Sequence, residues 1–145
     1  MSMTQLLFLF HGRLNRQPYW LITIAITIVM MLLVLFAWAM GADDEVAVSS
    51  AAVVIIVMLC IPLAWIGLAV SAKRLHDRDK SAWWLVVFYL VPAILGTIAY
   101  FLGMAGVVLH LVSFGIFVWA FVEIGCLRGT RGANRYGPNP LGRVA

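Results

Sequence analysis

Charged side chains are scarce in this chain. Only 11% of its 145 residues are Asp, Glu, Lys or Arg, whereas about a quarter of the residues in an ordinary soluble domain are charged. The hydrophobic fraction is 64%, which is more apolar surface than a domain of this length can hide in its interior. This composition fits neither a soluble single domain nor a disordered chain. The excess apolar surface is therefore expected to face lipid.

Cysteine is scarce as well, because Cys60 and Cys126 are the whole complement. The two lie far apart without a C-x-x-C or metal-ligand spacing, which predicts buried, reduced thiols and argues against a disulfide scaffold. No second His or Cys lies at a recognised ligand spacing from His76. The sequence therefore predicts no metal site, no cofactor and no catalytic residue.

The few charges enclose long uncharged stretches, which predict membrane spans. The first two stretches, residues 17–42 and 46–72, can each hold one helix that crosses a hydrocarbon core of about 30 Å at about 1.5 Å per residue. The third stretch is about twice too long for one crossing, and the sequence GMAG at residues 103–106 offers a reversal near its middle. We therefore predict an all-α membrane domain with transmembrane helices at residues 20–40, 51–72, 81–102 and 107–127.

The distribution of basic residues predicts the orientation. All ten lie in the amino-terminal segment (residues 1–19), around residues 73–80, or in the tail (residues 128–145). The loop between the first two spans carries only the acidic Asp43, Asp44 and Glu45. With four spans, the basic segments share one side, which the positive-inside rule makes the cytoplasm. Both termini are then cytoplasmic, and the apolar run at residues 6–10 is expected to lie on the inner leaflet.

This topology brings three polar motifs to the same membrane face. They read GRLNRQPYW at residues 12–20, KRLHDRDKSAWW at residues 73–84 and NRYGPNP at residues 134–140. Together they resemble the bacterial family known as domain of unknown function 805, and the resemblance covers nearly the whole chain. It implies a four-helix, multi-pass protein of the bacterial inner (plasma) membrane without an established activity. Ala82 stands where that family usually has a glycine before the Trp pair, which affects only the packing at the start of the third span.

The middle motif interleaves charges of both signs, although basic residues alone would satisfy the orientation rule. We therefore expect Asp77 or Asp79 to pair with Arg13, Arg16 or Arg135 and to lock the cytoplasmic face into one shape. The adjacent His76 and Asp77 leave two interpretations open: a hydrogen-bonded turn histidine, or the acid–base pair of a lipid-modifying membrane enzyme.

Glu123 is the one acidic residue within a predicted span. It lies close enough to the cytoplasmic boundary to pair with an arginine there. The alternative is a small transporter or channel subunit that uses this carboxylate.

The tail is expected to form an ordered turn under the bundle, anchored by Tyr136, and the alternative is a mobile tail held near lipid by its charge. Arg128, Arg131 and Arg135 would then join the other arginines in a basic pocket. The leading hypothesis is a non-enzymatic membrane protein whose basic and aromatic face binds anionic phospholipid headgroups or a partner protein. A homo-oligomer fits as well, whereas nucleic acid is not implied, because topology already explains the net charge of +4. The predicted contact residues are Arg13, Arg16, Arg74, His76, Asp77, Arg78, Arg131, Asn134, Arg135 and Tyr136.

Overall fold

The computed structural model describes residues 3–40 and 50–142, and within these ranges the chain is helical without a β-strand. The predicted acidic loop, with Asp43, Asp44 and Glu45, lies outside the described residues. The helices are α1 (Met3–Phe8), α2 (Arg16–Met40), α3 (Ser50–Asp77), the π-helical η1 (Val86–Leu90), α4 (Val91–Leu102), the 3-10 turn η2 (Gly103–Gly106), α5 (Val107–Ala120) and the π-helical η3 (Phe121–Cys126). The predicted all-α class is confirmed for this part of the chain.

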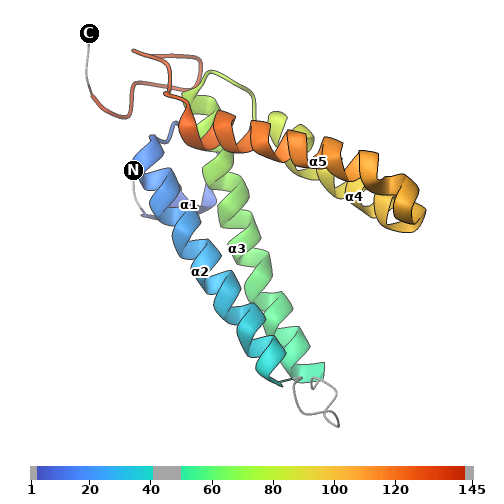
Figure 1. Ribbon diagram of the computed structural model, residues 1–145. Coiled ribbons are helices and arrows are strands. Elements are labelled where there is room, and N and C mark those ends of the chain that lie inside the picture. The colour runs from blue at the N-terminus through green and yellow to red at the C-terminus, as the bar shows by residue number, and fades with distance from the viewer. Residues whose placement is uncertain (1–2, 41–49, 143–145) are drawn as a thin grey trace.

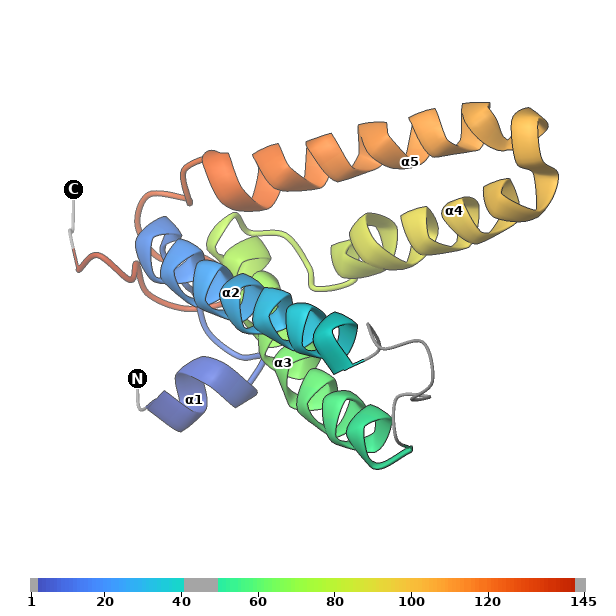
Figure 2. The same cartoon turned by 60° about the horizontal axis from the view of Figure 1, so that its bottom comes forward.

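Three helical stretches are long and apolar enough to cross a membrane: Arg16–Ala39, Val54–Asp77 and Val86–Cys126. The third turns back on itself at η2, so that α4 and α5 lie side by side as a hairpin (Figures 1 and 2). A Cβ atom at Gly106 would lie 2.2 Å from the carbonyl oxygen of Ala99, so only glycine fits at this close approach. The predicted reversal at residues 103–106 is thus confirmed.

Several helix ends differ from the ends of the predicted membrane spans. Helix α2 begins at Arg16, before the predicted span, and the Asn15 carboxamide oxygen accepts the Arg16 backbone N–H at 2.7 Å at this helix end. Helix α3 continues to Asp77, although the loop was expected to begin at residue 73. The protein buries this charged end and supplies its hydrogen-bond partners, so charge does not end the helix there. Residues 81–83 form a turn rather than the start of the third span.

The two long hairpins, α2 with α3 and α4 with α5, diverge from one shared end of the molecule (Figure 1). The buried apolar residues gather at this end, where Leu14, Tyr19, Val70, Phe88 and Ile124 belong to one cluster. Away from it many large apolar side chains are exposed, up to 90% for Met104 in the turn between α4 and α5, whereas Ala99 is buried where it packs against Gly106. This pattern is that of a protein whose surface is covered by lipid rather than water.

The apolar segment before α2 forms the short helix α1, which packs against α3. The Trp65 indole N–H donates to the Phe8 carbonyl oxygen at 3.1 Å, and the Phe10 and Trp65 rings meet edge to face at 5.1 Å. The Lys73 ammonium group donates to the carbonyl oxygens of Gln5, at 2.7 Å, and Leu6. A cation at these carbonyls of α1 stabilises the helix and holds it on the bundle.

Candidate functional site

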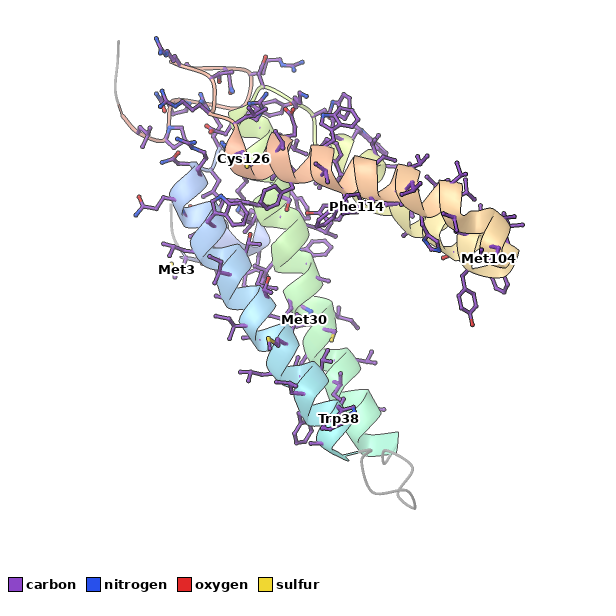
Figure 3. The ribbon with its side chains drawn as sticks, in the orientation of Figure 1. Met3, Met30, Trp38, Met104, Phe114 and Cys126 are labelled. Carbon is purple, nitrogen blue, oxygen red and sulfur yellow. The ribbon has the colours of Figure 1, made fainter. Side chains whose placement is uncertain are left out.

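The three motifs meet at the shared end of the hairpins and form a polar cap, defined here as residues 11–16, 73–81 and 123–142. Side-chain nitrogen atoms are concentrated in this region, beside Cys126 and the tail, whereas the hairpin arms carry almost only carbon (Figure 3). The cap is held together by ion pairs and by arginine contacts to backbone carbonyl groups.

Asp77 is the centre of the cap. Arg13 donates from Nε to Oδ1 of Asp77 at 3.0 Å, and Arg74 donates from Nη1 to Oδ2 at 2.6 Å. The side chains of Arg13, Arg74 and Asp77 are only 1%, 0% and 5% exposed. The expected pairing of Asp77 with Arg13 is confirmed, and both carboxylate oxygens are occupied.

Arg13 also holds the tail. Its Nη1 donates to the carbonyl oxygens of Gly132, at 2.7 Å, and Gly137, at 3.2 Å. Its Nη2 donates to the Thr130 carbonyl oxygen at 2.8 Å. One guanidinium therefore joins the first motif, the end of α3 and the tail, using the fixed fork of donors that only arginine offers.

Arg74 joins the end of α3 to the end of η3 in a similar way. Its Nε donates to the Ile124 carbonyl oxygen at 2.9 Å, and its Nη2 donates to the carbonyl oxygen of Leu127. These carbonyls belong to a helix end, where they lack partners within the helix. Arg74 therefore satisfies buried acceptors as well as Asp77.

Glu123 lies in the first turn of η3 and is paired twice. Its Oε1 accepts from Arg78 Nε at 2.6 Å and lies 2.9 Å from Lys80 Nζ. Lys80 in turn lies 4.8 Å from the centre of the Trp84 ring. The expected pairing of Glu123 with a nearby arginine is confirmed, and Lys80 is a partner that the sequence did not indicate.

His76 anchors the tail through its ring. The His76 and Tyr136 rings stack with their centres 3.9 Å apart and an angle of 5° between their planes. His76 Nδ1 lies 3.3 Å from the Gly12 carbonyl oxygen, and Asn134 donates from Nδ2 to the His76 carbonyl oxygen at 2.8 Å. The expected hydrogen bond of His76 and the expected anchoring by Tyr136 are both confirmed, but His76 lies in the last turn of helix α3 rather than in a loop turn.

A second pair joins the tail to the α3 end at the surface. Arg135 donates from Nε to Asp79 Oδ1 at 3.1 Å and from Nη2 to the Asp79 carbonyl oxygen at 2.5 Å. Both side chains are exposed, and the Asp79 carboxylate raises the pKa of Arg135 above its ordinary value. The expected pairing of Asp79 with Arg135 is thus confirmed, but such an exposed pair stabilises little.

Three arginines are left without a carboxylate partner among the described residues: Arg16, Arg128 and Arg131. All three line one pocket of about 650 Å³ between the start of α2 and the tail. Arg16 makes one contact, from Nη1 to the Cys126 carbonyl oxygen at 3.0 Å. The pocket therefore presents uncompensated positive charge, which suits a phosphate or carboxylate group.

A comparison with models of known protein families identifies the family of this chain. A model of the family described as "Protein of unknown function (DUF805)" matches residues 7–138. The chain belongs to the DUF805 family. This DUF805 chain is 30% identical over 137 residues to "Inner membrane protein YhaH" of Escherichia coli K12, which covers 90% of this chain and 86% of YhaH. The comparison with solved structures gives no match.

Two further relatives come from Escherichia coli K12. "Uncharacterized protein YiiR" is 34% identical over 141 residues, covering 94% of this chain and 89% of YiiR. "Inner membrane protein YhaI" is 28% identical over 131 residues, covering 90% of this chain and 85% of YhaI. Two of these relatives are inner-membrane proteins, and this DUF805 chain has helices long and apolar enough to cross a membrane. It is therefore an inner-membrane protein.

The side chains of the cap in this DUF805 protein are not arranged as metal ligands or as an acid–base pair among the described residues. Within residues 3–40 and 50–142, no three His, Cys, Asp or Glu side chains lie close enough together to hold a metal ion. Asp77 gives both oxygens to arginines, whereas His76 faces Gly12 and Tyr136. An acid–base pair requires the carboxylate to orient the imidazole, and these contacts direct the two side chains to different partners.

Proposed function

We propose that this DUF805 protein crosses the inner membrane four times, with both termini in the cytoplasm, and that its cap binds anionic phospholipid headgroups. The α4–α5 hairpin supports four crossings, because both ends of the hairpin return to the cap. The basic residues of the cap support a cytoplasmic location under the positive-inside rule. The cytoplasmic leaflet supplies anionic lipid at the depth where the cap would lie.

This proposal rests on one observation: some cations of the cap are paired with carboxylates, whereas others have no carboxylate partner. Five cations pair with the carboxylates of Asp77, Asp79 and Glu123, and Lys73 donates to carbonyl groups of α1. The three unpaired arginines are not scattered over the surface but line a single pocket. Guanidinium groups bind phosphate oxygens through charge-assisted hydrogen bonds, so this pocket is the place for a headgroup.

Under this proposal the predicted contact residues have two roles. Arg16 and Arg131 bind the headgroup together with Arg128. The remaining residues brace the cap or hold the tail in place: Arg13, Arg74, His76, Asp77, Arg78, Asn134, Arg135 and Tyr136.

The same contacts weaken the alternative functions. A transporter that relied on Glu123 would need this carboxylate to exchange protons or cations, yet Arg78 and Lys80 hold it in the polar cap. A lipid-modifying enzyme would need His76 and Asp77 to act on each other, and their hydrogen bonds lead elsewhere. A partner protein that docks through an acidic segment is the outcome to consider if lipid does not bind.

Native mass spectrometry of protein released from nanodiscs of phosphatidylglycerol and phosphatidylcholine tests the headgroup site. The wild type is expected to retain phosphatidylglycerol selectively. The double substitution Arg128→Gln with Arg131→Gln is expected to lower that retention about tenfold or more, because each charge-assisted hydrogen bond contributes about 1.5–3 kcal/mol.

The matched control for this experiment is Arg135→Gln, because Arg135 is a tail arginine that pairs with Asp79 outside the pocket. We expect this variant to retain phosphatidylglycerol as the wild type does. If the double variant retains as much phosphatidylglycerol as the wild type, the pocket is not a headgroup site and the search moves to crosslinked partner proteins.

A further inference from the structure

A second cavity, of about 540 Å³, shares Asn15 and Arg16 with the arginine pocket. We call this second cavity the slot. The other residues of its wall are Gln17, Trp20, Gly125 and Cys126. The slot therefore lies between the first turn of α2 and the end of η3, the two elements that enter the bilayer beside the cap under the proposed topology.

The wall of the slot is fixed by Trp20. Its indole N–H donates to the Gly125 carbonyl oxygen at 3.0 Å. A Cβ atom at Gly125 would lie 2.6 Å from Cζ2 of Trp20, so the ring lies directly on the glycine backbone. A tryptophan with its N–H bonded and its ring against apolar neighbours is typical of the layer between headgroups and acyl chains.

One helical turn farther from the cap, the surface on both sides of the slot is apolar and exposed. Leu21 of α2 is 64% exposed, and Phe121 and Val122 of η3 are also exposed. The path therefore runs from guanidinium groups, past an interfacial tryptophan, to a surface that suits acyl chains. A phospholipid has the same order of parts: a charged phosphate, a polar glycerol backbone and hydrocarbon.

The charge of the pocket limits the kind of headgroup. Three guanidinium groups lack an ion-pair partner among the described residues, and the one carboxylate in the pocket wall, Asp77, is already neutralised by Arg13 and Arg74. A headgroup with a single negative charge would leave two of the three arginines uncompensated. A headgroup with two negative charges matches the pocket more closely, and favourable pairing increases with each added guanidinium–phosphate contact.

We propose that the pocket and the slot together hold one lipid molecule, with a doubly charged phosphate headgroup in the pocket and the glycerol end in the slot. This inference rests on the proposed function, because it names the class of lipid and the path by which it reaches the same arginines. The lipid enters sideways from the inner leaflet, between α2 and η3, without leaving the bilayer. Phosphatidic acid, with both charges on one phosphate, and cardiolipin, with one charge on each of two, share the required chemistry.

The substitution Cys126→Trp tests the slot. Cys126 is an exposed residue of the slot wall, so the buried thiol that the sequence predicted there is wrong, and an indole at this position would obstruct the cavity. Val112→Trp is the matched control, since Val112 is an exposed residue of α5, away from the cap, and is not part of the slot wall. Each protein is measured by native mass spectrometry after release from phosphatidylcholine nanodiscs that contain equal amounts of phosphatidic acid, cardiolipin and phosphatidylglycerol. Inorganic pyrophosphate, which carries no acyl chain, is the soluble probe of the pocket alone.

We expect the wild type and Val112→Trp to retain a doubly charged lipid about tenfold better than phosphatidylglycerol, which corresponds to about 1.4 kcal/mol. Cys126→Trp is expected to lose this lipid about tenfold or more while it still binds pyrophosphate. Preference for phosphatidic acid or for cardiolipin tells whether the arginines converge on one phosphate or on two.

Two results would overturn the inference and leave the headgroup site standing. One is full lipid retention by Cys126→Trp, and the other is equal retention of all three anionic lipids by the wild type. Failure of the proposed function would give a different result. Pyrophosphate would then bind neither the wild type nor Val112→Trp, and the double substitution Arg128→Gln with Arg131→Gln would not change lipid retention.

Discussion

Replacing Asp77 with Asn is expected to lower the free energy of unfolding by about 3–5 kcal/mol, because it leaves two buried guanidinium groups without a counter-charge. Arg13 and Arg74 both donate to the Asp77 carboxylate, and each is also fixed by backbone carbonyls of the tail or of η3. Neither arginine can therefore turn to water without releasing these contacts. Thermal unfolding of the detergent-solubilised protein measures the loss.

Asp79→Asn is the matched control, since Asp79 is an aspartate two residues away whose pair with Arg135 is exposed. Asparagine also tolerates the positive φ of 58° at this position. The control is expected to change the free energy of unfolding by about 0–1 kcal/mol. Equal melting temperatures for Asp77→Asn and Asp79→Asn would refute the central role of Asp77.

The substitution Gly129→Ala is expected to destabilise the cap by about 1–3 kcal/mol, the usual cost of forcing extra volume into a packed site. A Cβ atom at residue 129 would lie 1.9 Å from Asp77 Oδ2 and 2.9 Å from Oδ1. The carboxylate cannot move away freely, because Arg13 and Arg74 hold its two oxygens. The tail must therefore shift, which weakens the hydrogen bond from the Thr130 N–H to the Asp77 carbonyl oxygen at 2.8 Å.

Chemical unfolding of Gly129→Ala should be compared with that of Gly67→Ala. Gly67 lies inside α3 with no atom within 4 Å of its would-be Cβ. Alanine there is expected to be neutral or to stabilise by up to about 1 kcal/mol through helix propensity. A Gly129→Ala protein as stable as the wild type would show that the tail does not pack on Asp77.

The sequence predicted the features that depend on the order and spacing of charged and apolar residues. Long uncharged stretches and the glycines at residues 103 and 106 were enough to predict the helices and the α4–α5 reversal. The mixture of charges in the middle motif predicted that Asp77 or Asp79 would pair with Arg13, Arg16 or Arg135. Two of these pairs form, Asp77 with Arg13 and Asp79 with Arg135. Both kinds of inference use local composition, which a single sequence displays directly.

The sequence did not predict which arginines remain unpaired. Arg13 and Arg74 are occupied mainly by backbone carbonyls more than 50 positions away in the chain, such as those of Thr130 and Leu127. Carbonyl groups are identical at every residue, so no side-chain pattern indicates which arginine will reach them. The same reason explains why α3 extends to Asp77, since acceptors from distant segments allow its charged end to be buried.

Under the proposed function, paired cations stabilise the cap, whereas unpaired cations bind lipid. Measuring both the melting temperature and the retained phosphatidylglycerol of Arg131→Gln and Lys80→Gln tests it most directly. Lys80 pairs with Glu123, so its substitution should lower the melting temperature by about 2–4 °C for each kcal/mol lost and leave lipid retention unchanged. Arg131→Gln should lower lipid retention and leave the melting temperature of the lipid-free protein unchanged. The reverse result, with Arg131→Gln destabilised and its lipid retained, would contradict the account.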